Sequence, residues 1–298
     1  MTDKYTHLIL SGGGLYGLCF LGIFRYLIIE KKLNSLKNIV GNSMGSFFSL
    51  GYSLNIDIDK LENIVKELKE CNDIKINKKN LGNLFKKNGI LNFSIFTNRL
   101  KIESKIDDIT FKEFSKKYGI NLYISATNIN KLENVIFSID NTPDVSVFDA
   151  VAASMSLPYM CEPILIDGEY YIDGCLSNNF PSNIFKNINK NNILGICIKI
   201  NSDYDIKKYE KNSKFTFLNY NKRLIDLLIM NIVKTTYLNN VNTDYCDLII
   251  IEDSPISDYL LYNMNKDKLE TSLSDIDIDN LILDGFIKAS DYFKYIKS

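Results

Sequence analysis

Apolar and polar positions follow a pattern that predicts strands and helices in turn along the chain. Short apolar runs are typical of buried strands, and apolar positions three or four residues apart are typical of helices. The runs that predict strands are 5–10, 37–40, 122–126, 135–139, 193–200 and 248–251, and 164–172 predicts a hairpin turning at Asp167-Gly168. Helices are predicted over 15–31, 44–54, 147–154, 224–237 and roughly the last 20 residues. Ser146 caps the helix over 147–154, and Asp57 caps a further amphipathic helix that follows it.

Strands that alternate with helices predict an α/β fold, and we expect a three-layer α/β/α sandwich around a mainly parallel central sheet. No internal repeat, Pro/Gly-rich linker or low-complexity tail marks a boundary. The sequence therefore predicts a single domain over residues 1–298. Its recognisable motifs lie within about 5–200, and we expect residues 201–298 to complete the same domain with helices and a strand.

The segment from Leu8 to Ile29 is largely apolar and about long enough to span a bilayer. It also contains Ser11, Arg25 and five glycines, three of them consecutive, which break a helix near its start. We therefore interpret it as a buried strand, a glycine turn and a buried helix. The first residues lack the apolar core of a signal peptide, so we expect a cytoplasmic protein or one peripheral to a membrane.

Composition narrows the possible chemistry. The chain has 298 residues, 46% of them hydrophobic and 24% charged, and a formal net charge of −1. Only three of its 35 basic residues are arginines, so we expect no binding of nucleic acid. The single histidine, His7, excludes a zinc site of three histidines, and none of the six cysteines forms a C-x-x-C pair. We expect reduced, packed cysteines, no metal and no cofactor.

A glycine-rich loop follows the first predicted strand, where Gly12, Gly13, Gly14 and Gly17 form the pattern G-x-G-x-x-G. A dinucleotide site with this pattern also needs an acidic residue after the second strand. That strand ends in Val40-Gly41-Asn42-Ser43, without a carboxylate, so the nucleotide interpretation fails. Consecutive glycines can still direct backbone N–H groups into one concavity that binds negative charge.

The second motif is Gly41-Asn42-Ser43-Met44-Gly45, a G-x-S-x-G sequence. It follows a predicted strand and opens an apolar helix, which is the place of a nucleophile elbow. Gly41 and Gly45 allow the tight turn that exposes the Ser43 hydroxyl. The alternative is that Ser43 merely caps the helix.

A nucleophilic serine needs a base. His7 starts the first strand, whereas sites in parallel sheets form at the carboxyl ends of the strands, about 13 Å away here. Asp173 ends the predicted hairpin, and a carboxylate can hold a serine hydroxyl and accept its proton. The alternative for Asp173-Gly174 is an ordinary turn.

These segments together resemble the patatin-like phospholipase family. Ala153-Ser154-Met155-Ser156-Leu157-Pro158 is similar to the family's A-S-x-x-x-P segment. Asp173-Gly174-Cys175, followed by Asn179-Phe180-Pro181, is similar to its D-G-G/A…N-x-P block. Residues 122–128 resemble a core strand of the family, and the order of the segments agrees over about 5–200.

The resemblance implies a lipid acyl hydrolase with a Ser-Asp dyad, in which Ser43 is the nucleophile and Asp173 is the base. It implies no metal and no cofactor. The oxyanion hole would consist of backbone N–H groups, which belong to Gly12, Gly13, Gly14 and Met44.

Two residues depart from the family pattern. Tyr16 stands where the glycine loop commonly carries a basic residue, and Cys175 replaces a glycine or alanine. An inactive or weakly active lipid-binding protein is therefore one alternative. A second alternative is an acyltransferase with the same site, although such enzymes use a histidine base that is missing here.

The segment 75–101 holds seven basic residues and no acidic one, interleaved with leucine and phenylalanine. We hypothesise that it docks an anionic membrane that carries the lipid substrate. The alternative is a solvated connector whose apolar residues face the core. The seven basic residues are Lys75, Lys78, Lys79, Lys86, Lys87, Arg99 and Lys101.

Overall fold

The computed structural model describes residues 4–70, 82–199, 245–252 and 274–295, together with Tyr220, Leu224 and Leu227. The predicted helix over 224–237 lies almost wholly outside these residues. Cys71, Lys75, Lys78 and Lys79 also lie outside them.

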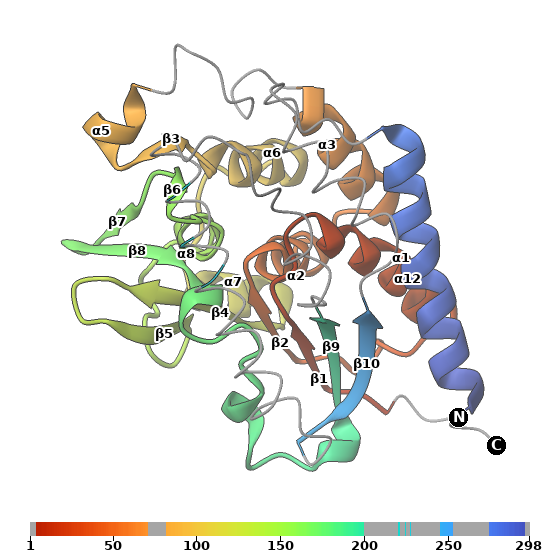
Figure 1. The fold of residues 1–298 in the computed structure, drawn as a ribbon. Helices are drawn as coiled ribbons and strands as arrows, with labels where there is room; N and C mark the ends of the chain where they lie inside the picture. The colour runs from red at the N-terminus through yellow and green to blue at the C-terminus, as the bar shows by residue number, and fades with distance from the viewer. Residues whose placement is uncertain are drawn as a thin grey trace.

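Among the described residues, a mixed sheet of eight strands forms the centre of the fold, in the order β10-β9-β1-β2-β4-β8-β7, with β5 paired to β4 (Figure 1). The pairs from β10 to β4 are parallel, whereas β5, β7 and β8 add antiparallel pairs. The predicted mainly parallel sheet is therefore confirmed. The strands are β1 (His7–Leu10), β2 (Asn38–Asn42), β4 (Asn121–Asn128), β5 (Glu133–Ser138), β7 (Ile164–Ile166), β8 (Glu169–Asp173), β9 (Ile193–Lys199) and β10 (Asp247–Glu252).

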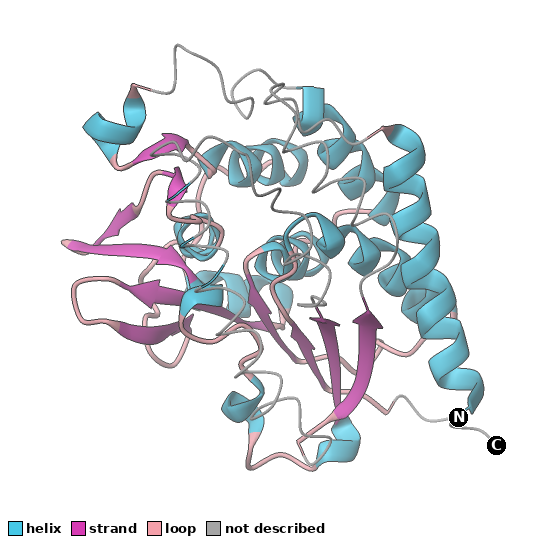
Figure 2. Ribbon diagram, viewed as in Figure 1, coloured by secondary structure: helices cyan, strands magenta, loops and turns pink. Residues whose placement is uncertain are grey.

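Helices flank this sheet (Figure 2). The α-helices are α1 (Cys19–Ile29), α2 (Met44–Ser53), α3 (Ile58–Glu70), α5 (Asn83–Lys87), α6 (Ser94–Ser104), α7 (Phe111–Tyr118), α8 (Val147–Ser154) and α12 (Asp275–Tyr295). Short 3-10 helices are η1 (Gly14–Leu18), η3 (Gly174–Leu176), η4 (Ser182–Phe185) and η5 (Lys190–Asn192). A separate parallel pair joins β3 (Gly89–Leu91) to β6 (Tyr159–Cys161).

The alternation of side chains along β1 divides the core between the two faces of the sheet. Leu8 and Leu10 belong to the larger apolar cluster, which includes the buried faces of α1, α2 and α12. Ile9 points to the opposite face, where it belongs to a smaller cluster with Phe180 and Phe185. In the described part of the chain, η4 therefore covers this second face.

The last described elements belong to the same sheet and helical layer as the first. β10 pairs with β9 in parallel and forms an edge of the sheet. α12 packs against α1 along its length (Figure 1). No helix in the described part of the chain is long and apolar enough to cross a membrane.

Several local predictions are confirmed. The helix over Val147–Ser154 has its predicted bounds, and the side chain of Ser146 accepts a hydrogen bond from the N–H of Asp149. The hairpin turns at Asp167-Gly168, both of which have positive φ. Asp57 caps α3 by accepting a hydrogen bond from the N–H of Asp59.

Other predictions need correction. The segment 15–31 is not one helix: it comprises the 3-10 helix η1, which begins at Gly14 with a φ of 50°, and the α-helix α1, which begins at Cys19 and ends at Ile29. The pattern also missed α6 and α7. α7 nevertheless carries a sequence signal, a capping box between Thr110 and Glu113.

Candidate active site

The turn between β2 and α2 holds Ser43 in a strained backbone conformation. Its φ is 50° and its ψ is −125°, a region that non-glycine residues rarely occupy. The turn is tight because its glycines lie against backbone. A Cβ on Gly41 would meet the carbonyl of Gly45 at 2.5 Å, and one on Gly45 would collide with the carbonyl of Ser11. This geometry is that of a nucleophile elbow, as the motif predicts.

Ser43 and Asp173 are in direct contact. The Oγ of Ser43 donates a hydrogen bond to Oδ2 of Asp173 at 2.7 Å, and the two side chains are buried. Ser43 retains an exposed fraction of 9%, against 3% for Asp173, so the serine is the more exposed of the two. Asp173 is the last residue of β8, which confirms its predicted place at the end of the hairpin.

The carboxylate of Asp173 is buried, which destabilises its ionised form. Burial raises the pKa of Asp173 to about 6, although hydrogen bonds from the backbone N–H of Cys175, from Ser43 and from the Cys175 thiol favour the ionised form. The N–H of Cys175 donates to Oδ1 at 2.8 Å, which leaves Oδ2 for Ser43. At neutral pH the carboxylate is therefore ionised and correctly placed to accept a proton.

The glycine loop lies directly against the elbow. A Cβ on Gly12 would come within 3.3 Å of the Cβ of Ser43, and one on Gly17 would come within 2.7 Å of the Cβ of Met44. The N–H of Gly12 donates to the carbonyl of Asn179 at 3.2 Å. Gly12 thus fixes the loop in place, and its own N–H is already engaged.

Three other N–H groups remain at this junction. Among the described residues, those of Gly13, Gly14 and Met44 form no hydrogen bond. Gly13 and Gly14 belong to the loop, and Met44 opens α2, where the first N–H groups of a helix have no internal partner. Backbone donors of this kind can stabilise an oxyanion.

Two buried asparagines connect the parts of the site, a connection that the sequence analysis missed. The side-chain amides of Asn42 and Asn179 are in contact at 3.0 Å, which links the elbow to the segment that binds Gly12. A Cβ on Gly174 would collide with the side chain of Asn42 and the backbone of Ser125, so the turn after Asp173 packs equally closely. The sequence signal that could have identified them is their position, since Asn42 lies inside the G-x-S-x-G motif and Asn179 begins the Asn179-Phe180-Pro181 block.

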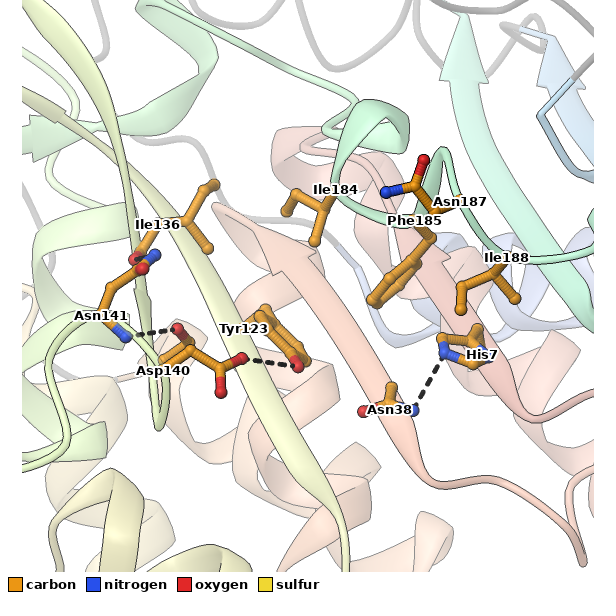
Figure 3. A pocket seen from close by; sticks show the side chains of 11 residues that line it. His7, Asn38, Tyr123, Ile136, Asp140, Asn141, Ile184, Phe185, Asn187 and Ile188 are labelled. Atoms are coloured by element: carbon orange, nitrogen blue, oxygen red, sulfur yellow. Dashed lines mark hydrogen bonds between the residues drawn. The ribbon is translucent and has the colours of Figure 1, made fainter.

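His7 lies away from this site, as predicted. Its ring contacts that of Phe185 and accepts or donates hydrogen bonds with Thr6 and Asn38. It lines a cavity of about 420 Å³ together with Tyr123 and Asp140 at the amino ends of β1 and β2 (Figure 3). Ser43 and Asp173 do not line this cavity.

Metal-binding residues do not cluster in the part of the chain that the structure describes, where no group of three His, Cys, Asp or Glu could hold an ion. The described cysteines are free and buried. Burial raises the pKa of the Cys175 thiol well above its ordinary value, and the neighbouring Asp173 carboxylate raises it further. This thiol therefore stays protonated beside Ser43 and Asp173.

Comparison with protein families gives an independent result. Residues 8–186 match the family described as patatin-like phospholipase. The chain belongs to this family. The match contains the glycine loop, the elbow, the A-S-x-x-x-P segment and the Asp173 block, which the resemblance had identified from the sequence.

Proteins similar in sequence to this chain occur in viruses and yeast. Probable lipid hydrolase 463L of Invertebrate iridescent virus 6 is 29% identical over 277 residues, covering 89% of this chain and 84% of the viral protein. Uncharacterized protein R571 of Acanthamoeba polyphaga mimivirus is 27% identical and covers 84% of this chain and 83% of that protein. Triacylglycerol lipase 4 of Saccharomyces cerevisiae is 30% identical over 51% of this chain, which is only 18% of the yeast protein.

Solved structures show the same fold at low sequence identity. VipD from Legionella pneumophila aligns with a TM-score of 0.54 and 15% identity, over 99% of this chain and 67% of VipD. The type III effector protein ExoU aligns with a TM-score of 0.50 and 13% identity, over 98% of this chain and 53% of ExoU. The α/β fold of this family member is therefore shared with proteins that are considerably longer.

Proposed function

We propose that this chain hydrolyses carboxylic ester bonds of lipids, with Ser43 as nucleophile and Asp173 as base. The observation that carries the proposal is the 2.7 Å hydrogen bond between Ser43 Oγ and the buried carboxylate of Asp173. Membership of the patatin-like phospholipase family and the named lipid hydrolase and lipase relatives support the same class of reaction.

In the acylation step, Asp173 accepts the proton of the Ser43 hydroxyl while Oγ attacks the carbonyl carbon of the ester. The negative charge that develops on the carbonyl oxygen faces the N–H groups of Gly13, Gly14 and Met44. Each such donor contributes about 3 kcal/mol to transition-state stabilisation. Collapse of the tetrahedral intermediate breaks the ester C–O bond, and Asp173 returns the proton to the leaving alcohol.

In the deacylation step, water attacks the acyl group on Ser43. Asp173 accepts a proton from this water, and the same backbone donors face the second oxyanion. When the second intermediate collapses, Ser43 regains its proton and a free carboxylic acid leaves. The carboxylate serves in both steps without a histidine, since it contacts the hydroxyl directly.

Covalent labelling tests this proposal. We expect a fluorescent fluorophosphonate to label the wild-type protein, which also releases fatty acid from mixed phospholipid vesicles. Ser43→Ala and Asp173→Asn should abolish both signals while the proteins remain folded by circular dichroism. A folded wild-type protein that neither labels nor releases fatty acid would instead support the lipid-binding alternative, with Tyr16 as the first residue to revert to a basic one.

We also propose that the segment 75–101 contributes to a peripheral lipid surface. Its described cations are already engaged in part: Lys87 pairs with Glu162 at 3.1 Å and Arg99 with Glu67 at 3.5 Å, while Lys101 lies over the ring of Phe148. Internal pairing reduces the positive charge that is free to attract anionic lipid. Lys86 and Lys87 are both exposed on α5, although Lys87 is paired with Glu162, and docking is tested on these two lysines together.

Vesicle co-sedimentation measures this docking. Reversal of Lys86 and Lys87 to glutamate should weaken binding to anionic vesicles and leave labelling by a soluble fluorophosphonate intact. The double reversal of Lys116 and Lys117, two exposed lysines of α7, changes the charge equally and provides the matched control. Equal binding by both double variants would eliminate a specific role for α5.

A further inference from the structure

Ser154, the last residue of α8, contacts the backbone of the proposed nucleophile. Its Oγ accepts a hydrogen bond from the N–H of Ser43 at 2.8 Å and donates one to the carbonyl of Ser125 at 2.6 Å. Ser154 is fully buried, so water cannot substitute for either contact. This hydroxyl thus joins the elbow to the adjacent strand β4.

The same stretch of chain also contacts the backbone of the proposed base. The carbonyl of Ser156 accepts a hydrogen bond from the N–H of Asp173 at 2.8 Å. The side chain of Ser156 donates to the carbonyl of Ala152 at 2.8 Å, which secures this residue to α8. Ser154 and Ser156 therefore contact the two members of the dyad from a single three-residue segment.

We propose that Ser154 is a positioning residue that sets the geometry of the dyad, an inference that rests on the proposed function of Ser43. Ser43 occupies a strained conformation that persists only if its surroundings hold it. The hydrogen bond from its N–H to Ser154 is one such restraint, and it engages this N–H with a partner inside the protein. Ser154 contacts neither substrate nor the reacting oxygen in this assignment.

A positioning role predicts a loss of rate rather than of substrate affinity. Without the hydroxyl, the buried N–H of Ser43 and carbonyl of Ser125 lose their partner, and the elbow can relax. Displacements of about 1 Å can cost about 100-fold in rate, so we expect Ser154→Ala to lower kcat and the fluorophosphonate labelling rate about 10- to 100-fold. The KM for a soluble ester should stay within about twofold, because substrate contacts are unchanged.

The pH dependence of the rate shows whether Ser154 acts on the geometry of Ser43 or on the pKa of Asp173. Ser154 makes no hydrogen bond to the Asp173 carboxylate, whose partners are Ser43 and Cys175. Ser154→Ala should therefore lower the plateau of the profile without moving its acid midpoint. Ser154→Cys keeps a weak hydrogen-bonding group in similar volume, and its rate should lie between those of wild type and Ser154→Ala.

Ser49 provides a matched control on α2. It is also a fully buried serine, and its hydroxyl has no hydrogen-bond partner among the described residues. Ser49→Ala should label at the wild-type rate. All rates are measured per folded protein, at a temperature well below each melting midpoint.

The outcomes separate the inference from the proposed function. Wild-type labelling that Ser43→Ala abolishes, with slow Ser154→Ala and intermediate Ser154→Cys, supports both. If the wild type labels and a folded Ser154→Ala or Ser154→Cys labels equally fast, the inference is overturned and the dyad stands. A rate loss matched by Ser49→Ala also overturns it. If the wild type does not label at all, the proposed function fails first.

Discussion

Ser43 and Asp173 meet because their strands pair with consecutive residues of β4. Asn42, immediately before Ser43, pairs with Ser125 in the parallel ladder of β2. Asp173 pairs with Ala126 in the antiparallel ladder of β8. Although 130 residues separate them in sequence, the register of one shared strand brings the hydroxyl and the carboxylate to 2.7 Å.

The buried carboxylate predicts how activity depends on pH. Asp173 accepts a proton only when it is ionised, and burial raises its pKa to about 6. We expect kcat/KM for a soluble ester to rise as pH increases through about 6 and to reach a plateau above that value. A profile that is flat between about pH 5 and about pH 8 would contradict the assignment of Asp173 as base.

The raised pKa of Asp173 also predicts that the ionised form required for activity makes the folded protein less stable than the protonated form does. Because the pKa of Asp173 is higher in the folded than in the unfolded chain, the folded state holds this proton more tightly. Its contribution to stability is complete below the unfolded pKa and is lost as pH rises through about 6.

Asp173→Asn should therefore unfold at a higher temperature than the wild type at pH 8, since it removes a buried charge. The difference should shrink as pH falls through about 6, where the wild-type carboxyl becomes neutral. Thermal melts at several pH values measure it. A variant less stable than the wild type at pH 8 would show that hydrogen bonds, not desolvation, dominate the energy of this side chain.

Substitution of Cys175 should change the acid midpoint of the pH profile while Ser43 and Asp173 themselves stay unchanged. Its protonated thiol donates a hydrogen bond to the Asp173 carboxylate, which favours the ionised form. Cys175→Ala removes this donor but keeps the backbone N–H that binds Oδ1. We expect the acid midpoint of kcat/KM to move to higher pH while the plateau stays close to wild type.

Cys161→Ala is the control for this prediction. Cys161 is also buried and free, but it makes no hydrogen bond to Ser43 or Asp173. Its substitution should leave the acid midpoint unchanged. An unmoved midpoint in Cys175→Ala would show that the thiol only fills space next to the carboxylate.

The sequence predicts features that depend on neighbouring residues. The helix Val147–Ser154 and the Asp167-Gly168 turn are correct because a capping serine and an Asp-Gly pair act within a few residues. The elbow at Ser43 is also local, since it needs only a strand, two glycines and a helix. Asp173 was identified as a candidate, but no local pattern could show that it touches Ser43.

What the sequence could not provide is strand register and long-range packing. The contact of Ser154 with the Ser43 N–H joins residues 111 positions apart, and it depends on where α8 ends relative to β4. The engagement of the Gly12 N–H by Asn179 likewise depends on a segment 167 residues away. Both contacts come from regions that the motifs mark, but motifs carry no information on which atoms meet.

Gly12 tests whether the close packing of the glycine loop is needed for catalysis. A Cβ at this position would lie 2.5 Å from Oδ1 of Asn179, 2.8 Å from Nδ2 of Asn42 and 3.3 Å from the Cβ of Ser43. Gly12→Ala must therefore displace the buried amides of Asn42 and Asn179 or move the loop away from the elbow, and we expect either change to shift the N–H group of Gly13. Since loss of one oxyanion donor costs about 100- to 1,000-fold in rate, we expect labelling to fall at least about 100-fold.

Gly82→Ala is the matched control, because a Cβ there meets nothing within 4 Å and the backbone has a φ of −64°. An L-residue adopts this conformation readily, so Gly82→Ala should label at the wild-type rate with equal or slightly higher stability. Gly12→Ala that stays folded and labels as fast as Gly82→Ala would mean that the loop does not supply the oxyanion donors. The N–H of Met44 would then have to act with donors from another part of the chain.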